Sequence, residues 1–512
     1  MKPSSLNAAR RERELAALEA GETVDVLVIG GGVTGAGVAL DAATRGLSVA
    51  LVERGDLANG TSRWSSKLVH GGLRYLAKGQ VGLARESAVE RGVLMDHTAP
   101  HLTRALGMVA PVGVGFPPAQ AAMTALGFAA GTALRVSAGT PRATLPNPRW
   151  LTAHETRLLV PGVDPSGLRG GLLNWDGQLV DDARLVVAVA RTAAAFGAHV
   201  LTRVRAEEVG ADGARVRDVQ TGQQLLVRAR HVVNATGVWA DQLHPEVRLR
   251  PSKGAHLVLD AASLGHPRAA LTVPVPDEPN RYVFALPQDD GRVYVGLTDD
   301  PVDVVSDRPV ADEADETFLL DVLSTALEVP LTPGDVVGSF AGLRPLLAGA
   351  DGATADLSRD HALLERPDGL LTIVGGKLTT YRRMAEDVVD RLAARPGVEV
   401  GACRTARQPL VGAAPRHRLA DLGAERRLVR RYGTEAVEVA GLARRSPELS
   451  ERVVTGGDHL RAEFAWAVRH EGALDAEDLV DRRTRIGLVA GERDQALAVA
   501  GEVLRAGAGA GV

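Results

Sequence analysis

Three glycines, Gly30, Gly32 and Gly35, form the pattern G-x-G-x-x-G, and the acidic residue Glu53 follows the first of them by 23 positions. Glycines at this spacing permit a tight turn and let a pyrophosphate approach the backbone at the start of a helix. A carboxylate about 20 residues further on can accept hydrogen bonds from a ribose. These residues therefore predict a dinucleotide-binding turn, provided that a strand precedes it and a helix follows.

A second group of chemically versatile residues lies in the segment 60–76. Serines, threonine and glycines alternate there with Lys67, His70, Arg74 and Tyr75. Small residues, hydroxyl groups and cations packed this densely are typical of a loop that presses against a planar, polar ligand. We expect this segment to line a ligand site.

The surrounding elements place both groups in one α/β domain. A β-branched run at 24–29, a helix at 36–45 and a second strand at 47–52 form a βαβ unit around the glycine turn. Further strands are expected at 198–201, 230–235 and 370–376, with helices at 185–196 and 378–392. The glycine motif thus has the strand–turn–helix context that dinucleotide binding requires.

Two later regions depart from this pattern. Residues 282–287 and 292–297 read as two strands that flank Asp289-Asp290-Gly291, which indicates an antiparallel hairpin and hence a second sheet. After residue 396 the chain is alternately charged and helical. We therefore expect an inserted antiparallel domain and a C-terminal helical domain.

Composition excludes several classes of protein. The chain has 512 residues, of which 45% are hydrophobic and 24% charged, as in ordinary globular proteins, and its formal charge of −4 provides no general attraction for nucleic acid. A single cysteine excludes an internal disulfide and a cysteine-ligated iron–sulfur cluster, and no histidine spacing indicates a metal. Residues 1–21 lack an apolar export segment, so a cytoplasmic location is expected.

Residues 105–134 carry no charged side chain. Prolines interrupt the stretch, and the remaining helix-like piece, 119–134, is shorter than the roughly 20 residues of a membrane span. Two alternatives remain open: a buried helix of the added domain, or a surface that docks on a membrane.

Several motifs resemble those of one known family. They are GGGVTGAGVALDAATRGLSVALVE from residue 30, SSKLVHGGLRYL from residue 65, RPSKGAH from 250, FAGLRPL from 340, IVGGKLTTY from 373 and DRRTR from 481. Together they resemble the FAD-dependent glycerol-3-phosphate dehydrogenases of the glycine-oxidase and D-amino-acid-oxidase superfamily. The resemblance spans 22 to about 395 and extends into the tail.

This resemblance implies a Rossmann-like FAD-binding domain, with an inserted antiparallel-sheet substrate domain and a C-terminal all-α domain. The oxidoreductase region is expected at 22–395. Its FAD-binding parts would be 22–85, 150–245 and 340–395, its substrate-domain parts 86–149 and 246–339, and the helical domain 396–512.

The resemblance also implies which residues bind FAD. They lie in the glycine turn, the 60–76 segment and two later turns: Gly30, Gly32, Val33, Thr34, Gly35, Glu53, Thr61, Ser62, Ser66, Lys67, Leu68, His70, Ala235, Thr236, Gly237, Gly376, Lys377 and Leu378. Three separated nucleotide-contact motifs on one chain favour FAD over NAD, whose domains normally need only the first.

The implied reaction is oxidation of sn-glycerol 3-phosphate to dihydroxyacetone phosphate, with hydride leaving C2 for flavin N5. A phosphomonoester requires converging arginine forks and a lysine. The expected substrate-binding residues are Arg74, Tyr75, Lys253, Arg281, Arg344, Lys377 and Thr380. His256, Arg344 and Lys377 are the expected catalytic residues; His256 is the favoured base and His70 its competitor.

Other readings stay open. A glycerol-3-phosphate oxidase would pass electrons to oxygen rather than to a quinone-type acceptor, a superfamily amino-acid oxidase would need a carboxylate clamp, and a flavin-binding scaffold would be inactive. An arginine-rich stretch could contact anionic lipid, giving a peripheral membrane protein, or be a solvated helical face. It comprises Arg404, Arg407, Arg416, Arg418, Arg426, Arg427, Arg430 and Arg431. The oligomeric state is open too, a homodimer included.

Overall fold

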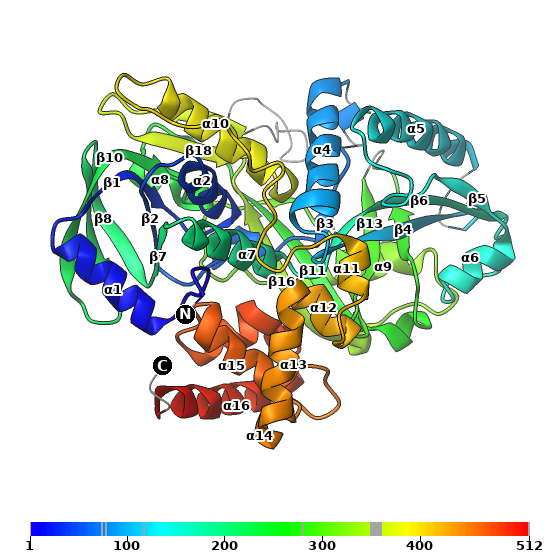
Figure 1. The fold of residues 1–512 in the computed structure, drawn as a ribbon. Helices are drawn as coiled ribbons and strands as arrows, with labels where there is room; N and C mark the ends of the chain where they lie inside the picture. Colours follow the sequence, from blue (N-terminus) through cyan, green and yellow to red (C-terminus); the bar gives the residue numbers. More distant parts are fainter. Residues whose placement is uncertain are drawn as a thin grey trace.

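The computed structural model describes residues 2–72, 75–76, 79–114, 116, 118–278, 281–348 and 361–509. Two mixed sheets lie next to each other, and a group of C-terminal helices packs against both (Figure 1). The predicted fold class is confirmed: one sheet is of the parallel nucleotide-binding kind, the second is largely antiparallel, and the tail is helical.

The first sheet carries the predicted βαβ unit. Its strand order is β17-β18-β10-β1-β2-β7, and β8 and β9 extend it at β10. The strands are β1 (Thr23–Ile29), β2 (Val49–Glu53), β7 (His199–Thr202), β8 (Val204–Gly210), β9 (Gly213–Asp218), β10 (Gln224–Asn234), β17 (His361–Glu365) and β18 (Leu371–Gly375). Strands β7, β2, β1, β10 and β18 run parallel, so their carboxyl ends meet at one edge.

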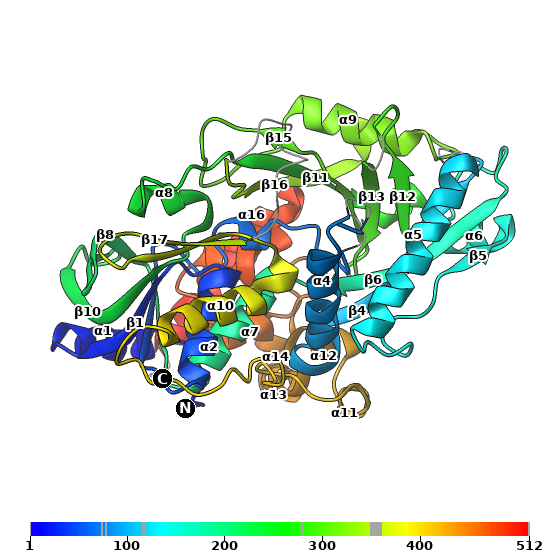
Figure 2. The ribbon, with the colours of Figure 1, turned by 90° about the horizontal axis from the view of Figure 1, so that it is seen from above.

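Helices cover this sheet because its strands are apolar on both faces. Helices α2 (Val33–Thr44), α7 (Asp182–Ala195) and α10 (Tyr381–Ala393) lie side by side over it (Figure 2). The side chain of Asp181 caps α7 by accepting a hydrogen bond from the Arg184 N–H. Helices α1 (Ala8–Glu19) and α8 (Ala240–Leu243) pack on the opposite face, where Leu18 and Leu243 join the cluster that contains Leu27 and Ile29 of β1.

The second sheet has the order β15-β11-β14-β13-β12-β4-β6-β3, with β16 paired to β11 and β5 paired to β6. Its strands are β3 (Leu68–Val69), β4 (Thr103–Val112), β5 (Arg149–Leu151), β6 (Gly170–Leu179), β11 (Ser252–Asp260), β12 (Ala270–Pro274), β13 (Tyr282–Pro287), β14 (Arg292–Gly296), β15 (Asp300–Pro301) and β16 (Val336–Arg344). Strands β13 and β14 form the predicted hairpin. Its helices are α4 (Val81–Val93), α5 (Pro118–Ser137), α6 (Ala153–Leu159) and α9 (Glu313–Ser324).

The predicted boundaries between the two domains differ from the structure. Residues 150–179 were assigned to the nucleotide domain, but β6 pairs with β4 along its whole length, from Leu179 opposite Thr103 to Gly170 opposite Val112. Likewise β16 pairs with β11 as far as Arg344, and β3 pairs with β6. Long-range antiparallel pairing, which sequence periodicity does not encode, moves these segments into the second sheet.

The uncharged stretch is only partly a helix. Its first residues continue β4, and α5 then spans Pro118–Ser137. The structure does not show the first alternative, a buried helix, because Met123 and Leu126 are each 75% exposed. Within the described ranges, no helix combines the length and apolar character needed to cross a membrane.

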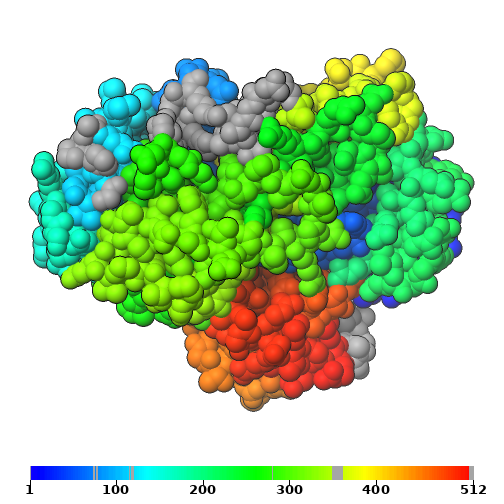
Figure 3. All heavy atoms as spheres, turned by 180° about the vertical axis from the view of Figure 1, so that it is seen from behind, coloured from blue at the N-terminus to red at the C-terminus, as the bar shows by residue number. Residues whose placement is uncertain are grey.

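The C-terminal helices form a separate layer below the two sheets (Figure 3). They are α11 (Arg416–Ala420), α12 (Arg426–Tyr432), α13 (Ala436–Arg445), α14 (Pro447–Ser450), α15 (Arg461–His470) and α16 (Ala490–Gly509), with a π-helical segment at Asp478–Thr484. Buried ion pairs attach the layer to the nucleotide domain, among them Arg184–Glu471 at 2.6 Å and Arg191–Glu435 at 2.7 Å.

Part of the arginine-rich stretch of this layer is engaged in ion pairs and backbone hydrogen bonds. Arg427 binds Glu463, Arg430 binds Asp289, and Arg431 binds Asp181. Arg404 and Arg416 donate to backbone carbonyl groups of the oxidoreductase region. These contacts fix five of the eight arginines in the layer, while Arg407, Arg418 and Arg426 are exposed.

Candidate active site

A cavity of about 1540 Å³ lies between the two sheets. It starts at the carboxyl ends of β1, β2, β10 and β18 and reaches the second sheet at Asn174 and Phe284. Small-ligand pockets usually measure roughly 300–1,000 Å³. This cavity can therefore hold a dinucleotide together with a smaller second molecule.

The glycine turn shapes the end of the cavity at β1. Gly30 has φ of +114°, and a Cβ there would lie 2.6 Å from the carbonyl oxygen of Ala235. A Cβ on Gly35 would collide with the Gly30 carbonyl oxygen. Both positions therefore exclude side chains, and α2 begins directly against the cavity with its backbone N–H groups toward it.

Glu53 is fixed beside this turn. Its two carboxylate oxygens accept hydrogen bonds from the N–H groups of Gly31 and Gly55, each at 2.7 Å. Burial nevertheless raises the pKa of Glu53 above its ordinary value. A carboxylate at the end of β2 is thus placed where a ribose hydroxyl could reach it.

Two further turns reach the same edge of the sheet. Thr236 follows β10 and donates its N–H and hydroxyl to Asn234 Oδ1, and Gly237 has φ of +62°. Gly375 and Gly376 follow β18 with φ of +81° and +72°. Each of these turns lines the cavity, so the three predicted nucleotide-contact motifs meet there.

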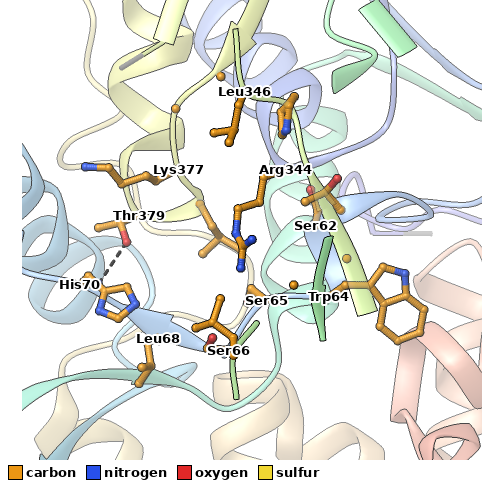
Figure 4. Close-up of a pocket in the computed structure, with 18 of the residues that line it drawn as sticks. Ser62, Trp64, Ser65, Ser66, Leu68, His70, Arg344, Leu346, Lys377 and Thr379 are labelled. Atoms are coloured by element: carbon orange, nitrogen blue, oxygen red, sulfur yellow. Dashed lines mark hydrogen bonds between the residues drawn. The ribbon is translucent and has the colours of Figure 1, made fainter. Parts of the chain in front are cut away.

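The segment 60–76 crosses from the nucleotide end to the second sheet. Ser62 accepts the Val33 N–H at 2.9 Å, and Thr61 donates to the Leu343 carbonyl at 2.6 Å. In Figure 4, Arg344 extends into the middle of the labelled residues, with Lys377, Thr379 and His70 on one side and Ser62 and Trp64 on the other. This segment therefore connects the cofactor turns to the side chains that could do chemistry.

His256 lies in the cavity wall and is 2% exposed. It is directly opposite Phe340 in the β11–β16 register, and the two rings stack at 4.7 Å. Its Nε2 is 2.8 Å from Ser66 Oγ, whereas its Nδ1 has no hydrogen-bond partner among the described residues. Burial, with the charges of Lys67, Arg344 and Arg485, lowers the pKa of His256 well below 6.5, so the imidazole is neutral at neutral pH.

Arg344 presents a guanidinium to the same cavity. It donates to Ser252 Oγ at 3.0 Å, to Asp299 Oδ1 at 2.9 Å and to the Thr298 carbonyl at 3.1 Å. A Cβ on Gly254 would clash with the guanidinium, so this glycine leaves the space that Arg344 occupies. The cation is thereby anchored at the wall while its side chain lines the cavity.

Lys377 supplies a second cation from the turn after β18. Its Nζ donates to Ser87 Oγ at 2.9 Å and lies 3.7 Å from the centre of the Tyr75 ring. Both Lys377 and Tyr75 line the cavity. An anionic group entering between Lys377 and Arg344 would face positive charge from two sides.

Most of the predicted site residues line this cavity. They are Gly30, Gly32, Val33, Thr34, Glu53, Thr61, Ser62, Ser66, Leu68, His70, Tyr75, Ala235, Thr236, Gly237, His256, Arg281, Arg344, Gly376, Lys377 and Leu378. Arg281 does so while paired with Glu278 at 2.8 Å. Arg74 lies outside the described residues.

Four predicted site residues lie elsewhere. Lys253 pairs with Asp312, the N-cap of α9, at 2.5 Å and with Asp315 on α9 at 2.6 Å. The fully buried Lys67 pairs with Asp182 at 2.8 Å, beneath the cavity floor. Thr380 is buried and Thr379 lines the cavity in its place, while Gly35 backs the turn. The ammonium groups of Lys253 and Lys67 bind nearby carboxylates instead of facing the cavity. The sequence pattern does not reveal these carboxylates.

Sequence reasoning missed several residues of the cavity. Arg54 stacks on Trp239 at 4.5 Å, and both line the nucleotide end. Arg54 directly follows Glu53, and Trp239 lies two residues after Gly237, so these positions are a signal that could have pointed to them. Asp176 pairs with Arg91 at 2.6 Å and lies 3.4 Å from His70, and no sequence motif indicates it. No cluster of three metal-ligating side chains occurs in the described part of the chain.

Two family models match the chain. One, described as FAD dependent oxidoreductase, covers residues 25–391, and one described as the C-terminal domain of alpha-glycerophosphate oxidase covers 403–509. The chain is 53% identical to glycerol-3-phosphate dehydrogenase 1 of Mycobacterium tuberculosis, with 98% of each chain covered. It is 35% identical to a mitochondrial glycerol-3-phosphate dehydrogenase of Arabidopsis thaliana, covering 94% of this chain and 82% of that relative.

Solved structures agree with these matches. The glycerol-3-phosphate dehydrogenase from Bacillus halodurans complexed with FAD has a TM-score of 0.75 at 29% identity and covers 98% of this chain and 94% of its own. The L-alpha-glycerophosphate oxidase from Mycoplasma pneumoniae, with FAD bound, shares the fold, with a TM-score of 0.58 at 18% identity, covering 76% and 99%.

The residues of this chain fit the cofactor that these relatives bind. Gly30 and Gly35 leave a cradle that any Cβ would fill, α2 directs N–H groups toward it, and the Glu53 carboxylate lies beside the turn, where a ribose hydroxyl could reach it. The chain belongs to the family of FAD-dependent glycerol-3-phosphate dehydrogenases, and FAD is its cofactor.

Proposed function

We propose that this enzyme oxidises sn-glycerol 3-phosphate to dihydroxyacetone phosphate. The observation that carries the proposal is a single cavity that joins the FAD turns to a neutral His256 and to the cations of Arg344 and Lys377. Oxidation removes a hydride from C2 and a proton from the C2 hydroxyl, leaving a ketone. Bound FAD supplies the acceptor for the hydride and its two electrons.

Arg344 and Lys377 are proposed to bind the phosphate. A phosphomonoester carries close to two negative charges at neutral pH and three acceptor oxygens. A guanidinium can bind two of those oxygens at once, and an ammonium acts as a compact point charge. Because Asp299 already anchors Arg344, the guanidinium is held in place before the substrate arrives.

His256 is proposed to take the hydroxyl proton. A general base must be unprotonated and within reach of the substrate, and the lowered pKa of His256 together with its place in the wall supports both conditions. His70 is the alternative; its side chain is about half exposed and sits 3.4 Å from Asp176. The neighbouring Asp176 carboxylate suits His70 to a hydrogen-bonding role.

Anaerobic mixing with glycerol 3-phosphate tests the reaction directly. The visible absorbance of the bound flavin should bleach within the first seconds of a stopped-flow trace. Glycerol or an amino acid should not bleach it. His256→Asn should slow bleaching by more than about tenfold, and His70→Asn by less. A wild-type spectrum that glycerol 3-phosphate leaves unchanged would refute the proposal.

A quinone-type acceptor is proposed for the second half of the reaction, with a peripheral membrane contact through α5. The support is that Met123 and Leu126 of this helix are exposed and also line the cavity. Turnover with a soluble quinone should exceed turnover with oxygen, and vesicles should bind wild type better than Leu126→Glu. Stoichiometric hydrogen peroxide in air would instead identify an oxidase.

A further inference from the structure

Arg485 reaches from the C-terminal layer into the junction between the two sheets. It follows the π-helical segment Asp478–Thr484, has φ of +66°, and its side chain is buried. One guanidinium nitrogen donates to the Tyr294 hydroxyl of β14 at 2.8 Å. Another lies 3.8 Å from Asp182 Oδ1 at the start of α7. A single side chain of the tail thus contacts both domains of the oxidoreductase region.

Asp182 links Arg485 to residues 63–67, which lie below the cavity. Its Oδ2 accepts hydrogen bonds from Lys67 Nζ and Ser65 Oγ, each at 2.8 Å, and from the Ser65 N–H at 3.0 Å. Lys67 is fully buried, and its ammonium also donates to the Arg63 carbonyl at 2.8 Å. The residues on both sides of Ser66 are therefore bound to a carboxylate whose other oxygen, Oδ1, faces Arg485.

Ser66 is the hydrogen-bond neighbour of His256, at 2.8 Å. A second route also ends at this histidine: Tyr294 packs edge-on against Phe340 at 5.4 Å, and Phe340 stacks on the imidazole. Lys67 Nζ lies 4.6 Å from the centre of the same Phe340 ring. The contacts of Arg485 thus converge on His256 through Asp182 and through Tyr294.

We propose that Arg485 is a positioning residue for His256, through which the C-terminal layer holds the imidazole in its orientation for substrate oxidation. The proposal rests on the proposed function, because it assigns His256 the role of base. Arg485 touches neither the cavity nor, in this scheme, the substrate.

The charges around His256 also favour the neutral form of its imidazole. After burial, the groups that lower its pKa are Lys67, Arg344 and Arg485. Asp182 and Asp299 stand behind the first two and partly offset them. Removing the charge of Arg485 should therefore make His256 easier to protonate.

The test compares Arg485→Met, Arg485→Lys and wild type as FAD-loaded full-length enzymes. Arg485→Met should lower the limiting rate of flavin reduction by glycerol 3-phosphate more than about tenfold and change KM less than about threefold. It should also raise the pH at which His256 titrates, followed by NMR of ¹³C-labelled histidine and assigned with His256→Asn. Arg485→Lys, which keeps the charge, should recover the titration and part of the rate.

Glu435→Gln is the matched control. It breaks the Arg191–Glu435 pair, which joins the same layer to the same helix α7 about two and a half turns further along. It should lower the melting temperature but leave the rate and the titration of His256 unchanged. If Arg485→Met does not fold, Tyr294→Phe removes the same hydroxyl contact and should lower the rate about threefold.

Wild-type rate and titration in Arg485→Met, or an equal loss in Glu435→Gln, would overturn the proposal. The two proposals fail separately, because the titration needs no substrate. Wild-type flavin that glycerol 3-phosphate does not reduce would refute the function, while the shift of the His256 titration would still support or overturn the coupling to Arg485.

Discussion

At one end of the cavity, the turns after β1, β10 and β18 present backbone to the cofactor; at the other, Arg344, Lys377 and His256 present side chains. The backbone end depends on what is absent, since Gly30 and Gly35 leave no room for a Cβ. The side-chain end depends on what is present, namely two cations and a neutral imidazole. The two ends should therefore respond to opposite kinds of substitution.

The two ends of the cavity differ because one is suited to a pyrophosphate and the other to a small organic phosphate. A pyrophosphate is satisfied by N–H groups that every residue carries, so its site needs close approach and little side-chain chemistry. A small phosphate with a reacting carbinol needs fixed charge and a proton acceptor, which only particular side chains supply. Shape should control the first end, and charge the second.

The largest effect is expected at the backbone end. Gly30→Ala should lose FAD affinity by more than about 100-fold, because its Cβ meets the Ala235 carbonyl and its φ of +114° is strained for alanine. Gly46→Ala is the control: Gly46 has φ of +97° but no atom within 4 Å of its Cβ position. It should cost stability and keep FAD. The ratio of flavin to protein absorbance decides, and full FAD occupancy in Gly30→Ala would contradict shape control.

This contrast also explains what the sequence could predict. The turn, α2 and Glu53 lie within 24 residues and form by local pattern, so their positions were predictable to within a few residues. Lys253 was not, because its partner Asp315 lies 62 residues further on, on α9. Lys67 lies outside the cavity because it pairs with Asp182, which is also far along the chain. Long-range pairing decides which polar side chains remain in a cavity, and periodicity carries no information on it.

At the side-chain end, Arg344→Ala should lower substrate affinity or turnover more than about tenfold, because a charge-assisted, forked contact is lost. Arg344→Lys should lie between alanine and wild type. FAD content should stay unchanged in both, in contrast to Gly30→Ala. Stopped-flow flavin reduction at varied substrate gives the affinity and the limiting rate separately, and wild-type values for Arg344→Ala would remove Arg344 from the substrate site.

The pH dependence of flavin reduction tests the side-chain end without a substitution. The base must be neutral, and burial with three neighbouring cations lowers the pKa of His256 well below 6.5. The limiting rate should therefore stay level as the pH falls from 8 to 6.5, and should decline only in more acidic solution, where the imidazole becomes protonated. A decline centred at or above pH 6.5 would indicate an imidazole that lacks this cationic surrounding.

The smallest effect on activity is expected for Lys253→Met. Lys253 lies on β11 only three residues before His256, but its ammonium is held by Asp312 and Asp315 outside the cavity. The substitution should leave KM and the limiting rate within about twofold of wild type, and should lower the melting temperature because the buried carboxylate of Asp315 loses its cation. Lys377→Met is the matched lysine inside the cavity and should lower activity more than about tenfold with little loss of stability. Similar activity losses in both lysine variants would mean that closeness along the chain, rather than the side of the sheet that a lysine occupies, determines the substrate end.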